Sequence, residues 1–430
     1  MGVQRLMPLL ARFAPGCISM PTAKDLSGLV LAMDSNIFVH RFLKGVDGGT
    51  DEKRHLRGMH RLATYAQTLG VTPLFVFDGK VPTQGKESEL DKRQVERLRM
   101  FLELEREKTR AQRVVKLTAI SAQLVAECDP SSPAGPDDAQ AVAWLKARVQ
   151  ELAADAGRPQ QSIAGRMDQL EAAACRELLL GFGAQPGPGY AGGDACDVHG
   201  AQALSTLQAL SAERVAVLGR RVEPLTDDKI GECVELVAAM GCATHVAGPC
   251  EESEGVCAQL CRAGVADAVC SEDLDVVAFG ARLLRGFGTP GARAPMVLVD
   301  AERAHEELEL SREAFVDLCI LCGTDFSSTL EKVGPITALR LVREHGSIER
   351  ILERSAFQPR PGFTPDVARH VFLTNRQPPP IHSRNQLRQL ARPADPAAVA
   401  ALLGGGHPSP DDSRAPLDGT DPFARSRVLP

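Results

Sequence analysis

The stretch Ala268–Gly280 reads AVCSEDLDVVAFG and turns from apolar to acidic within a few residues. Its apolar start is typical of a buried strand, and Asp273 and Asp275 follow where that strand ends. In open α/β sheets the ligand site lies beyond the carboxyl ends of the strands, where two acids at i and i+2 can point into one crevice. The stretch therefore predicts a carboxylate site at a sheet edge.

The same pattern occurs twice nearer the N-terminus. Residues Leu29–Met33 lead into Asp34, and Leu74–Phe77 lead into Asp78. Because helical patterns separate these two runs, strand, helix and strand alternate as in a βαβ unit. We therefore predict an α/β fold with a mostly parallel central sheet flanked by helices, whose strands bring carboxylates to one edge.

A divalent metal is the expected occupant of such an edge. Carboxylates that are packed together repel one another and would take up protons unless cations neutralise them. Their oxygen atoms are the ligands that Mg²⁺ prefers in proteins. The acidic cluster therefore predicts a metal site, with Mg²⁺ as the first candidate.

Composition sets the broad class of the chain. With 430 residues and 44% hydrophobic residues it can bury a large core, and its length allows two or three domains. The net charge of −6 argues against a uniform coat of nucleic acid but leaves room for a local basic patch. No apolar stretch is long enough to span a bilayer, so we expect no membrane partner. The 12 cysteines without a secretory signal predict reduced thiols inside the cell.

A long helical pattern with dense mixed charge extends from Lys80 to Lys116. Such a pattern is usual for a solvated helix with ion pairs along its surface. Here it follows directly after Asp78, so its cations are well placed to hold phosphates near the metal site. They are Lys86, Lys92, Arg93, Arg97, Arg99, Arg106, Lys108, Arg110, Arg113 and Lys116. The position of the helix favours a functional role over a purely structural one.

Residues 111–226 have the character of an insertion. Helical patterns at 137–154 and 162–182 are followed by a stretch, 185–193, that is too rich in Gly and Pro for regular structure. It contains no motif with a recognisable chemistry. We expect regular structure to resume with a helix at 227–240.

Acidic residues also open the helix that follows Pro249. Acids in a first helical turn commonly complement the helix dipole and need no further role. Glu252 and Glu254, however, precede the strand of Asp273 by about one βαβ crossover. This spacing returns them to the same sheet edge, which favours a place in the metal site.

A helix, a turn and a further helix come later in the chain. The helical pattern at 313–322 leads into Gly323-Thr324-Asp325, and Gly334-Pro335 precedes a helical pattern at 338–345. In such a hairpin, helix N-termini and exposed amides can face a DNA phosphate. A plain αα-hairpin has the same pattern, so the sequence pattern alone leaves both interpretations open.

The predicted organisation therefore has four parts. They are an N-terminal region at 1–110, the insertion at 111–226, an internal region with the hairpin at 227–355 and a C-terminal extension at 356–430. The extension carries weak helical patterns at 385–390 and 396–403, and we expect disorder at its end.

Several linked motifs resemble the structure-specific 5′ nuclease superfamily, also called XPG/Rad2-like, and within it the flap endonuclease group. In chain order they are Met1–Gln4, Asp34, Val76–Pro82, Ser271–Asp275 with Phe279-Gly280, Asp317–Asp325, Gly334-Pro335 and Arg343–Glu349. The likeness covers residues 1 to about 110 and 227 to about 375. It implies a PIN-like nuclease fold with a helical arch, which would carry the insertion, and a helix-hairpin-helix element that binds DNA.

The resemblance also implies the metal ligands. Two Mg²⁺ ions, for which Mn²⁺ can substitute, would be held by seven acids: Asp34, Asp78, Glu252, Glu254, Asp273, Asp275 and Asp325. The Glu pair is placed by counting back from Cys257, and a slip of one residue would bring in Glu251. Two ions about 3.5 to 4 Å apart can activate a water and stabilise the leaving oxygen. Lys86 and Arg93 match the family's cations that steady the scissile phosphate.

DNA contacts are implied as well, with departures from the family pattern. The contact residues would be Gly2, His40, Arg61, Lys92, Arg97, Lys332 and Gly334. His40 stands where the family usually has a stacking Tyr, while Asp47, Leu62 and Tyr65 stand where basic contacts are expected. The hairpin lacks the usual Lys-Arg after its Pro. Because phosphate contacts supply most non-specific affinity, we expect either weaker and more salt-sensitive DNA binding or a changed substrate.

The function predicted from the resemblance is a Mg²⁺-dependent nuclease that cuts 5′ flaps or branched DNA in replication and repair. A 5′ to 3′ exonuclease of the same superfamily and a catalytically weak DNA-binding scaffold are the alternatives, and a small-molecule phosphatase ranks last. The tail shows no clamp-binding peptide, so we do not expect sliding-clamp binding. We expect a monomer. We also expect it to act in the nucleus, because the similarity begins at Met1 and leaves no room for a removable presequence.

Overall fold

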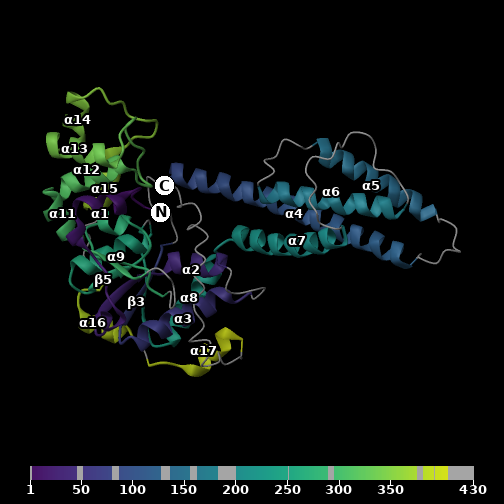
Figure 1. The fold of residues 1–430 in the computed structure, drawn as a ribbon. Helices are drawn as coiled ribbons and strands as arrows, with labels where there is room; N and C mark the ends of the chain where they lie inside the picture. Colours follow the sequence, from purple (N-terminus) through teal and green to yellow (C-terminus); the bar gives the residue numbers. More distant parts are fainter. Residues whose placement is uncertain are drawn as a thin grey trace. The chain divides into compact units, whose positions relative to one another are not determined.

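The computed structural model describes residues 2–45, 52–79, 87–126, 136–154, 162–182, 200–249, 251–288, 295–374, 381–391 and 393–404. The chain forms two compact units (Figure 1). The first, the α/β body, combines Met1–Gln94 with Glu223–Pro430, and the second, the helical unit, is Val95–Val222. These units divide the chain near residues 94 and 222, whereas the sequence pattern places the insertion at 111–226.

The α/β body contains a seven-stranded sheet in the order β1-β7-β6-β5-β2-β3-β4 among the described residues. The strands are β1 Ile18–Ser19, β2 Val30–Asp34, β3 Thr72–Phe77, β4 Ala243–Val246, β5 Ala268–Cys270, β6 Leu283–Arg285 and β7 Val297–Val299. The central pairs from β4 to β6 are parallel, and only β7 pairs antiparallel, with β6 and β1. The predicted α/β fold with a mostly parallel sheet is confirmed.

Both faces of the sheet are buried, as parallel sheets require. Along β2, Val30 and Ala32 belong to one apolar core, whereas Leu31 and Met33 belong to a second core. This division follows from the alternation of side chains along a strand. Helices α9, Ser253–Arg262, and α12, Arg312–Cys322, contribute to the first core (Figure 1). Helices α3, Arg54–Thr68, and α8, Asp227–Ala239, contribute to the second.

The remaining helices of the body complete these layers. They are α1 Leu6–Phe13, α2 Ser35–Lys44, α10 Asp275–Ala278, α11 Ala301–Leu308, α13 Pro335–His345, α14 Ile348–Arg354, α15 Pro365–Thr374, α16 Arg384–Leu390 and α17 Pro396–Leu403. The predicted hairpin helices correspond to α12 and α13, and the weak C-terminal patterns to α16 and α17. Of the predicted disordered tail at 404–430, Gly404 is the C-cap of α17, and 405–430 lie outside the described residues.

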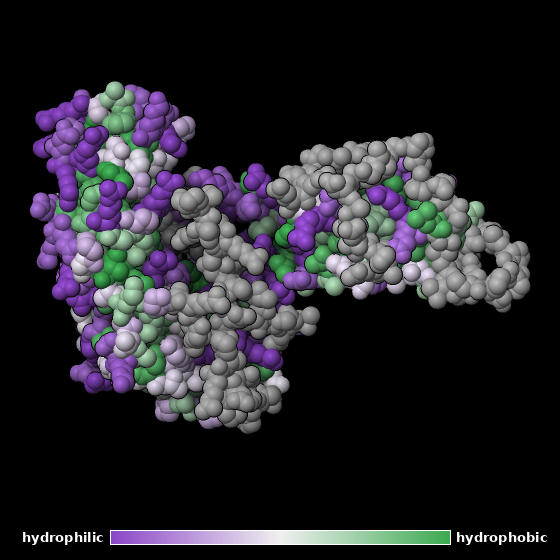
Figure 2. All heavy atoms as spheres, viewed as in Figure 1, coloured by the Kyte–Doolittle hydropathy of each residue, from purple (hydrophilic) through white to green (hydrophobic). Residues whose placement is uncertain are grey.

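The hairpin helix α13 has defined ends. Gly334 is its N-cap and Pro335 occupies the first turn, where the missing N–H of proline costs nothing. Gly346 ends the helix at a φ of 84°, a conformation that glycine adopts without strain. Much of the surface of α13 and α14 seen in Figure 2 is hydrophilic.

The helical unit contains most of α4, Glu87–Ala126, together with α5 Pro136–Ala154, α6 Ile163–Gly181 and α7 Gly200–Val222. Helices α5 and α6 match the predicted patterns, but α7 is absent from the prediction, which resumed regular structure only at 227. Leu117, Leu145, Leu179 and Leu207 are fully buried in a core of its own. The insertion is thus a packed helical bundle.

None of the described helices is long and apolar enough to cross a membrane.

Candidate metal centre

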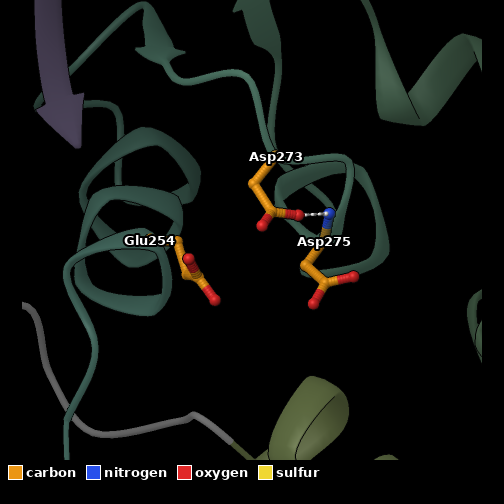
Figure 3. A group of neighbouring side chains, drawn as sticks. All are labelled: Glu254, Asp273 and Asp275. Atoms are coloured by element: carbon orange, nitrogen blue, oxygen red, sulfur yellow. Dashed lines mark hydrogen bonds between the residues drawn. The ribbon is translucent and has the colours of Figure 1, made fainter. Parts of the chain in front are cut away.

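Three carboxylates meet at the carboxyl ends of the parallel strands. Ligand atoms of Glu254, Asp273 and Asp275 all lie within 4.8 Å of one another. Glu254 comes from the first turn of α9, Asp273 follows β5, and Asp275 begins α10. Their side chains point toward a common space (Figure 3). The predicted convergence of these acids is therefore present in the structure.

The turn between Asp273 and Asp275 is tightly held. The Asp275 backbone N–H donates to Asp273 Oδ1 at 3.0 Å (Figure 3), and the Asp273 N–H donates to Ser271 Oγ at 3.0 Å. Gly2 lies against this turn, because a Cβ added at Gly2 would stand 1.8 Å from Asp273 Oδ1. Its φ of 77° is a second reason for glycine at this position. Gly2 is thus part of the wall of the acidic cluster.

Asp34 and Asp78 are joined by the hydroxyl of Ser253. Ser253 Oγ lies 2.7 Å from Asp34 Oδ1 and 2.7 Å from Asp78 Oδ1, and the Ser253 N–H donates to Asp78 Oδ1 at 2.8 Å. On the other oxygens, Ser271 Oγ donates to Asp34 Oδ2 at 2.7 Å, and the Asn36 amide donates to Asp78 Oδ2 at 2.5 Å. Both carboxylates are therefore oriented by neutral donors.

The sequence analysis assigns no role in the site to the three donors Ser253, Ser271 and Asn36. Each of the three lies within two residues of a predicted acid in the sequence. Serine and asparagine at the start of a helix or in a turn are, however, common capping residues. Only the side-chain directions in the fold separate a carboxylate donor from an ordinary cap.

Burial and mutual repulsion raise the pKa values of two acids. The pKa of Asp34 lies well above its ordinary value, first because the group is buried and then because Glu254 and Asp78 add negative charge nearby. Burial, with the Glu254 charge next, raises the pKa of Asp273 to about 7. A cation relieves this repulsion, and the donor set consists of oxygen atoms. The site therefore fits a divalent metal ion.

Asp325 adjoins this cluster. It follows α12, and its charge contributes to the raised pKa of Asp273. Arg93 Nη2 lies 3.1 Å from Asp325 Oδ2. The structure thus brings the predicted cation Arg93 to a predicted metal acid. The other predicted cation of this pair, Lys86, lies outside the described residues.

The two remaining glutamates have different positions. Glu251 Oε2 accepts the Gly248 N–H at 2.9 Å, and the Glu251 carbonyl accepts the Gly79 N–H at 3.1 Å. Glu251 therefore stabilises the loop after β4 by hydrogen bonds. Glu252 is the N-cap residue of α9, two positions before Glu254. This arrangement supports the register that assigns Glu252 and Glu254, and the metal role of Glu252 stays a prediction.

The predicted DNA contacts occupy several elements. His40 on α2 and Arg61 on α3 are half-buried, while Lys92 on α4 is exposed. Lys332 is exposed at a φ of 59°, just before Gly334 at the start of α13. Arg97 is exposed in the helical unit. Their roles in DNA binding stay predictions.

Two family models match the chain: the XPG N-terminal domain at residues 1–100 and the XPG I-region at residues 243–325. Asp34, Asp78, Glu254, Asp273, Asp275 and Asp325 all fall inside these two ranges. The matches thus cover the segments that build the acidic cluster.

Curated relatives point in the same direction. Flap endonuclease 1 of Ostreococcus tauri is 40% identical over 148 residues, which are 34% of this chain and 38% of that protein. Flap endonuclease 1 of Phytophthora infestans is 27% identical over 369 residues, which are 82% of this chain and 69% of that protein. The first three relatives are matched over only 38% to 39% of their own length.

Among solved structures, flap endonuclease-1 from Methanococcus jannaschii aligns with a TM-score of 0.47 at 17% identity, over 92% of this chain and 91% of that one. The domain matches and the curated relatives agree with each other. The chain thus carries segments that match the XPG N-terminal domain and the XPG I-region, and over these parts it is similar to flap endonuclease 1.

Proposed function

We propose that this protein is a metal-dependent, structure-specific 5′ nuclease that hydrolyses phosphodiester bonds at 5′ flaps or branch points of DNA. The observation that carries the proposal is the meeting of Glu254, Asp273 and Asp275 within 4.8 Å, beside Asp34 and Asp78. The names of its relatives, flap endonuclease 1, support the same activity. A scaffold without turnover would gain nothing from buried carboxylates that repel one another.

The proposed metals are two Mg²⁺ ions, with Mn²⁺ as a substitute. Their ligands would come from Asp34, Asp78, Glu252, Glu254, Asp273, Asp275 and Asp325. Bound to these carboxylates, the ions would supply the Lewis acidity that phosphodiester hydrolysis needs. Arg93, beside Asp325, would hold the scissile phosphate next to these acids, and Lys86 would share that task.

Binding of branched DNA would use phosphate contacts on more than one element. At the hairpin, the N-terminus of α13 with Gly334 and the exposed Lys332 offers amides and a cation to a phosphate. Gly2, His40, Arg61, Lys92 and Arg97 complete the proposed contacts. Because charge on these contacts is sparse, we expect weak DNA binding.

The direct test is cleavage of a 5′-labelled flap duplex, a blunt duplex and a single strand at low salt, with and without Mg²⁺. Asp275→Ala tests the cluster, and Glu213→Gln, an exposed acid of the helical unit, is the matched control. Mg²⁺-dependent cutting near the flap base that is lost only in Asp275→Ala supports the proposal. Stepwise release from the blunt 5′ end favours the exonuclease alternative. Flap binding without any cutting contradicts the enzymatic proposal.

The proposal includes a monomer that acts in the nucleus and does not bind a sliding clamp. Light scattering of the purified protein tests the first point, and microscopy of the tagged chain tests the second. A pull-down with purified clamp tests the third.

A further inference from the structure

A single buried hydroxyl connects two of the proposed metal ligands. Ser253 is 1% exposed and is the first residue of α9, while Asp34 ends β2 and Asp78 follows β3. Its Oγ lies 2.7 Å from one carboxylate oxygen of each acid. The hydroxyl thus sits between carboxylates that come from two neighbouring strands.

The two acids depend on this hydroxyl to different degrees. Asp78 also receives the Ser253 N–H and the Asn36 amide, which a change of the side chain at 253 leaves in place. At Asp34, Ser271 donates its hydroxyl to Oδ2, and the Ser253 hydroxyl lies 2.7 Å from Oδ1, where its one proton is shared with Asp78. Removal of the Ser253 hydroxyl should therefore loosen Asp34 more than Asp78.

These hydrogen bonds leave room for a cation. An ionised carboxylate has about four lone-pair sites, so an oxygen that accepts one hydrogen bond can still bind a metal ion. Groups that hydrogen-bond to metal ligands fix their orientation, and their loss typically weakens metal binding about 10- to 100-fold. Ser253 is such a group, because its hydroxyl lies within hydrogen-bond distance of both proposed ligands.

We propose that Ser253 is a positioning residue for the metal centre, whose hydroxyl fixes the Asp34 and Asp78 carboxylates before a cation binds. This inference rests on the proposed function, because it takes both acids as metal ligands. The proposed role of Ser253 acts through these two carboxylates. A Ser253 that merely fills space in the first turn of α9 would affect stability but not metal affinity.

The test measures Mn²⁺ binding by calorimetry, without DNA, to the natural protein and to Ser253→Ala. We expect about a tenfold loss of affinity in Ser253→Ala. The matched control is Ser211→Ala, since Ser211 is also 1% exposed, and its Oγ makes no hydrogen bond within the described structure. Ser211→Ala should bind Mn²⁺ like the natural protein. Circular dichroism and thermal unfolding establish that each variant is folded.

A second comparison separates the hydroxyl from packing. Ser253→Thr retains the hydroxyl and should recover most of the affinity lost in Ser253→Ala. In case the added methyl group prevents folding, Ser253→Ala is also measured in an Asp34→Asn background. Because the hydroxyl acts through that carboxylate, the loss caused by Ser253→Ala should be smaller there than in the natural protein.

Several outcomes overturn the inference. Equal Mn²⁺ affinity of Ser253→Ala and the natural protein, with flap cleavage intact, refutes the role of Ser253 but not the nuclease proposal. If the fold losses of Mn²⁺ affinity in the two single variants multiply to give the loss in the double variant, the two residues act independently. This result refutes the role of Ser253 as well. A natural protein that binds no Mn²⁺ overturns both this inference and the proposed metal centre.

Discussion

Arg369 holds the buried carboxylate of Asp317 through two parallel hydrogen bonds, 2.6 Å from Nε to Oδ1 and 2.8 Å from Nη2 to Oδ2. The same guanidinium binds Glu349, with Nη1 2.5 Å from Oε1, and lowers the pKa of Glu349 to about 2. Asp317 Oδ2 also accepts the Ile348 N–H at 3.0 Å. Arg369 on α15 therefore ties the hairpin helix α12 to the start of α14.

We expect Arg369→Ala to destabilise the α/β body by about 3 kcal/mol, since removal of one partner leaves the Asp317 charge buried without its counter-ion. Urea unfolding of the metal-free protein measures this loss. Arg354→Ala, which removes an exposed arginine from α14, should change the stability by about 0.5 kcal/mol or less. Equal stability of the two variants would show that the Asp317 pair contributes little.

The pH dependence of stability should report the acidic cluster. The pKa of Asp273 is raised from 3.8 to about 7, so the folded state binds this proton more tightly than the unfolded state. The resulting stabilisation is fully present below about pH 4 and is lost as the pH rises through about 7. The metal-free protein should therefore lose stability from this group between those values, whereas added Mg²⁺ should stabilise it more at pH 8 than at pH 5.

Thermal unfolding across this range, with EDTA or with Mg²⁺, tests the prediction. Asp273→Asn cannot ionise and should flatten this part of the EDTA profile. If the stability of Asp273→Asn in EDTA depends on pH as steeply as that of the natural protein, other groups cause the effect.

Gly2 gives a test of how closely the N-terminus packs on the cluster. A Cβ at Gly2 would lie 1.8 Å from Asp273 Oδ1 and 2.8 Å from the Asp275 nitrogen, so Gly2→Ala must displace the turn. We expect cleavage to fall about 100-fold, the size of effect that a displacement of about 1 Å can have on a reacting geometry. Gly28→Ala is the matched control, because Gly28 has a φ of 82° but, apart from its chain neighbours, nothing in the described part of the chain lies within 4 Å of the added Cβ. Similar losses in the two variants would point to backbone strain rather than contact.

The parts that the sequence predicted are those with strong periodic patterns. The buried runs of β2 and β3 are long enough to identify as strands, and parallel strands share one carboxyl edge, so Asp34 and Asp78 could be brought together without coordinates. By contrast, β6 and β7 have three residues each, too few to carry an alternation. The helix α7 follows a Gly- and Pro-rich run that obscured its start.

The fine structure of the site was less predictable, for a physical reason. That Glu254 joins the cluster follows from a helical register that can be counted along the chain. That Ser253 turns its hydroxyl toward two carboxylates depends on its rotamer and on how α9 packs against β2 and β3. The ion pair of Arg93 with Asp325 joins residues 232 positions apart, which local patterns do not encode.

Arg93 provides the last prediction. Its guanidinium lies 3.1 Å from Asp325 and is 46% exposed, so it adjoins the acids while remaining open to a phosphate. If it stabilises charge that develops on the scissile phosphate, Arg93→Ala should lower kcat about 100-fold while flap affinity changes much less. Arg93→Lys should restore only part of the rate, because lysine keeps the charge but not the planar fork. Single-turnover cleavage and flap binding in EDTA measure the two quantities, with Arg388→Ala, an exposed arginine of α16, as the control. A loss of affinity as large as the loss of rate would instead make Arg93 a simple phosphate anchor, with no preference for the transition state.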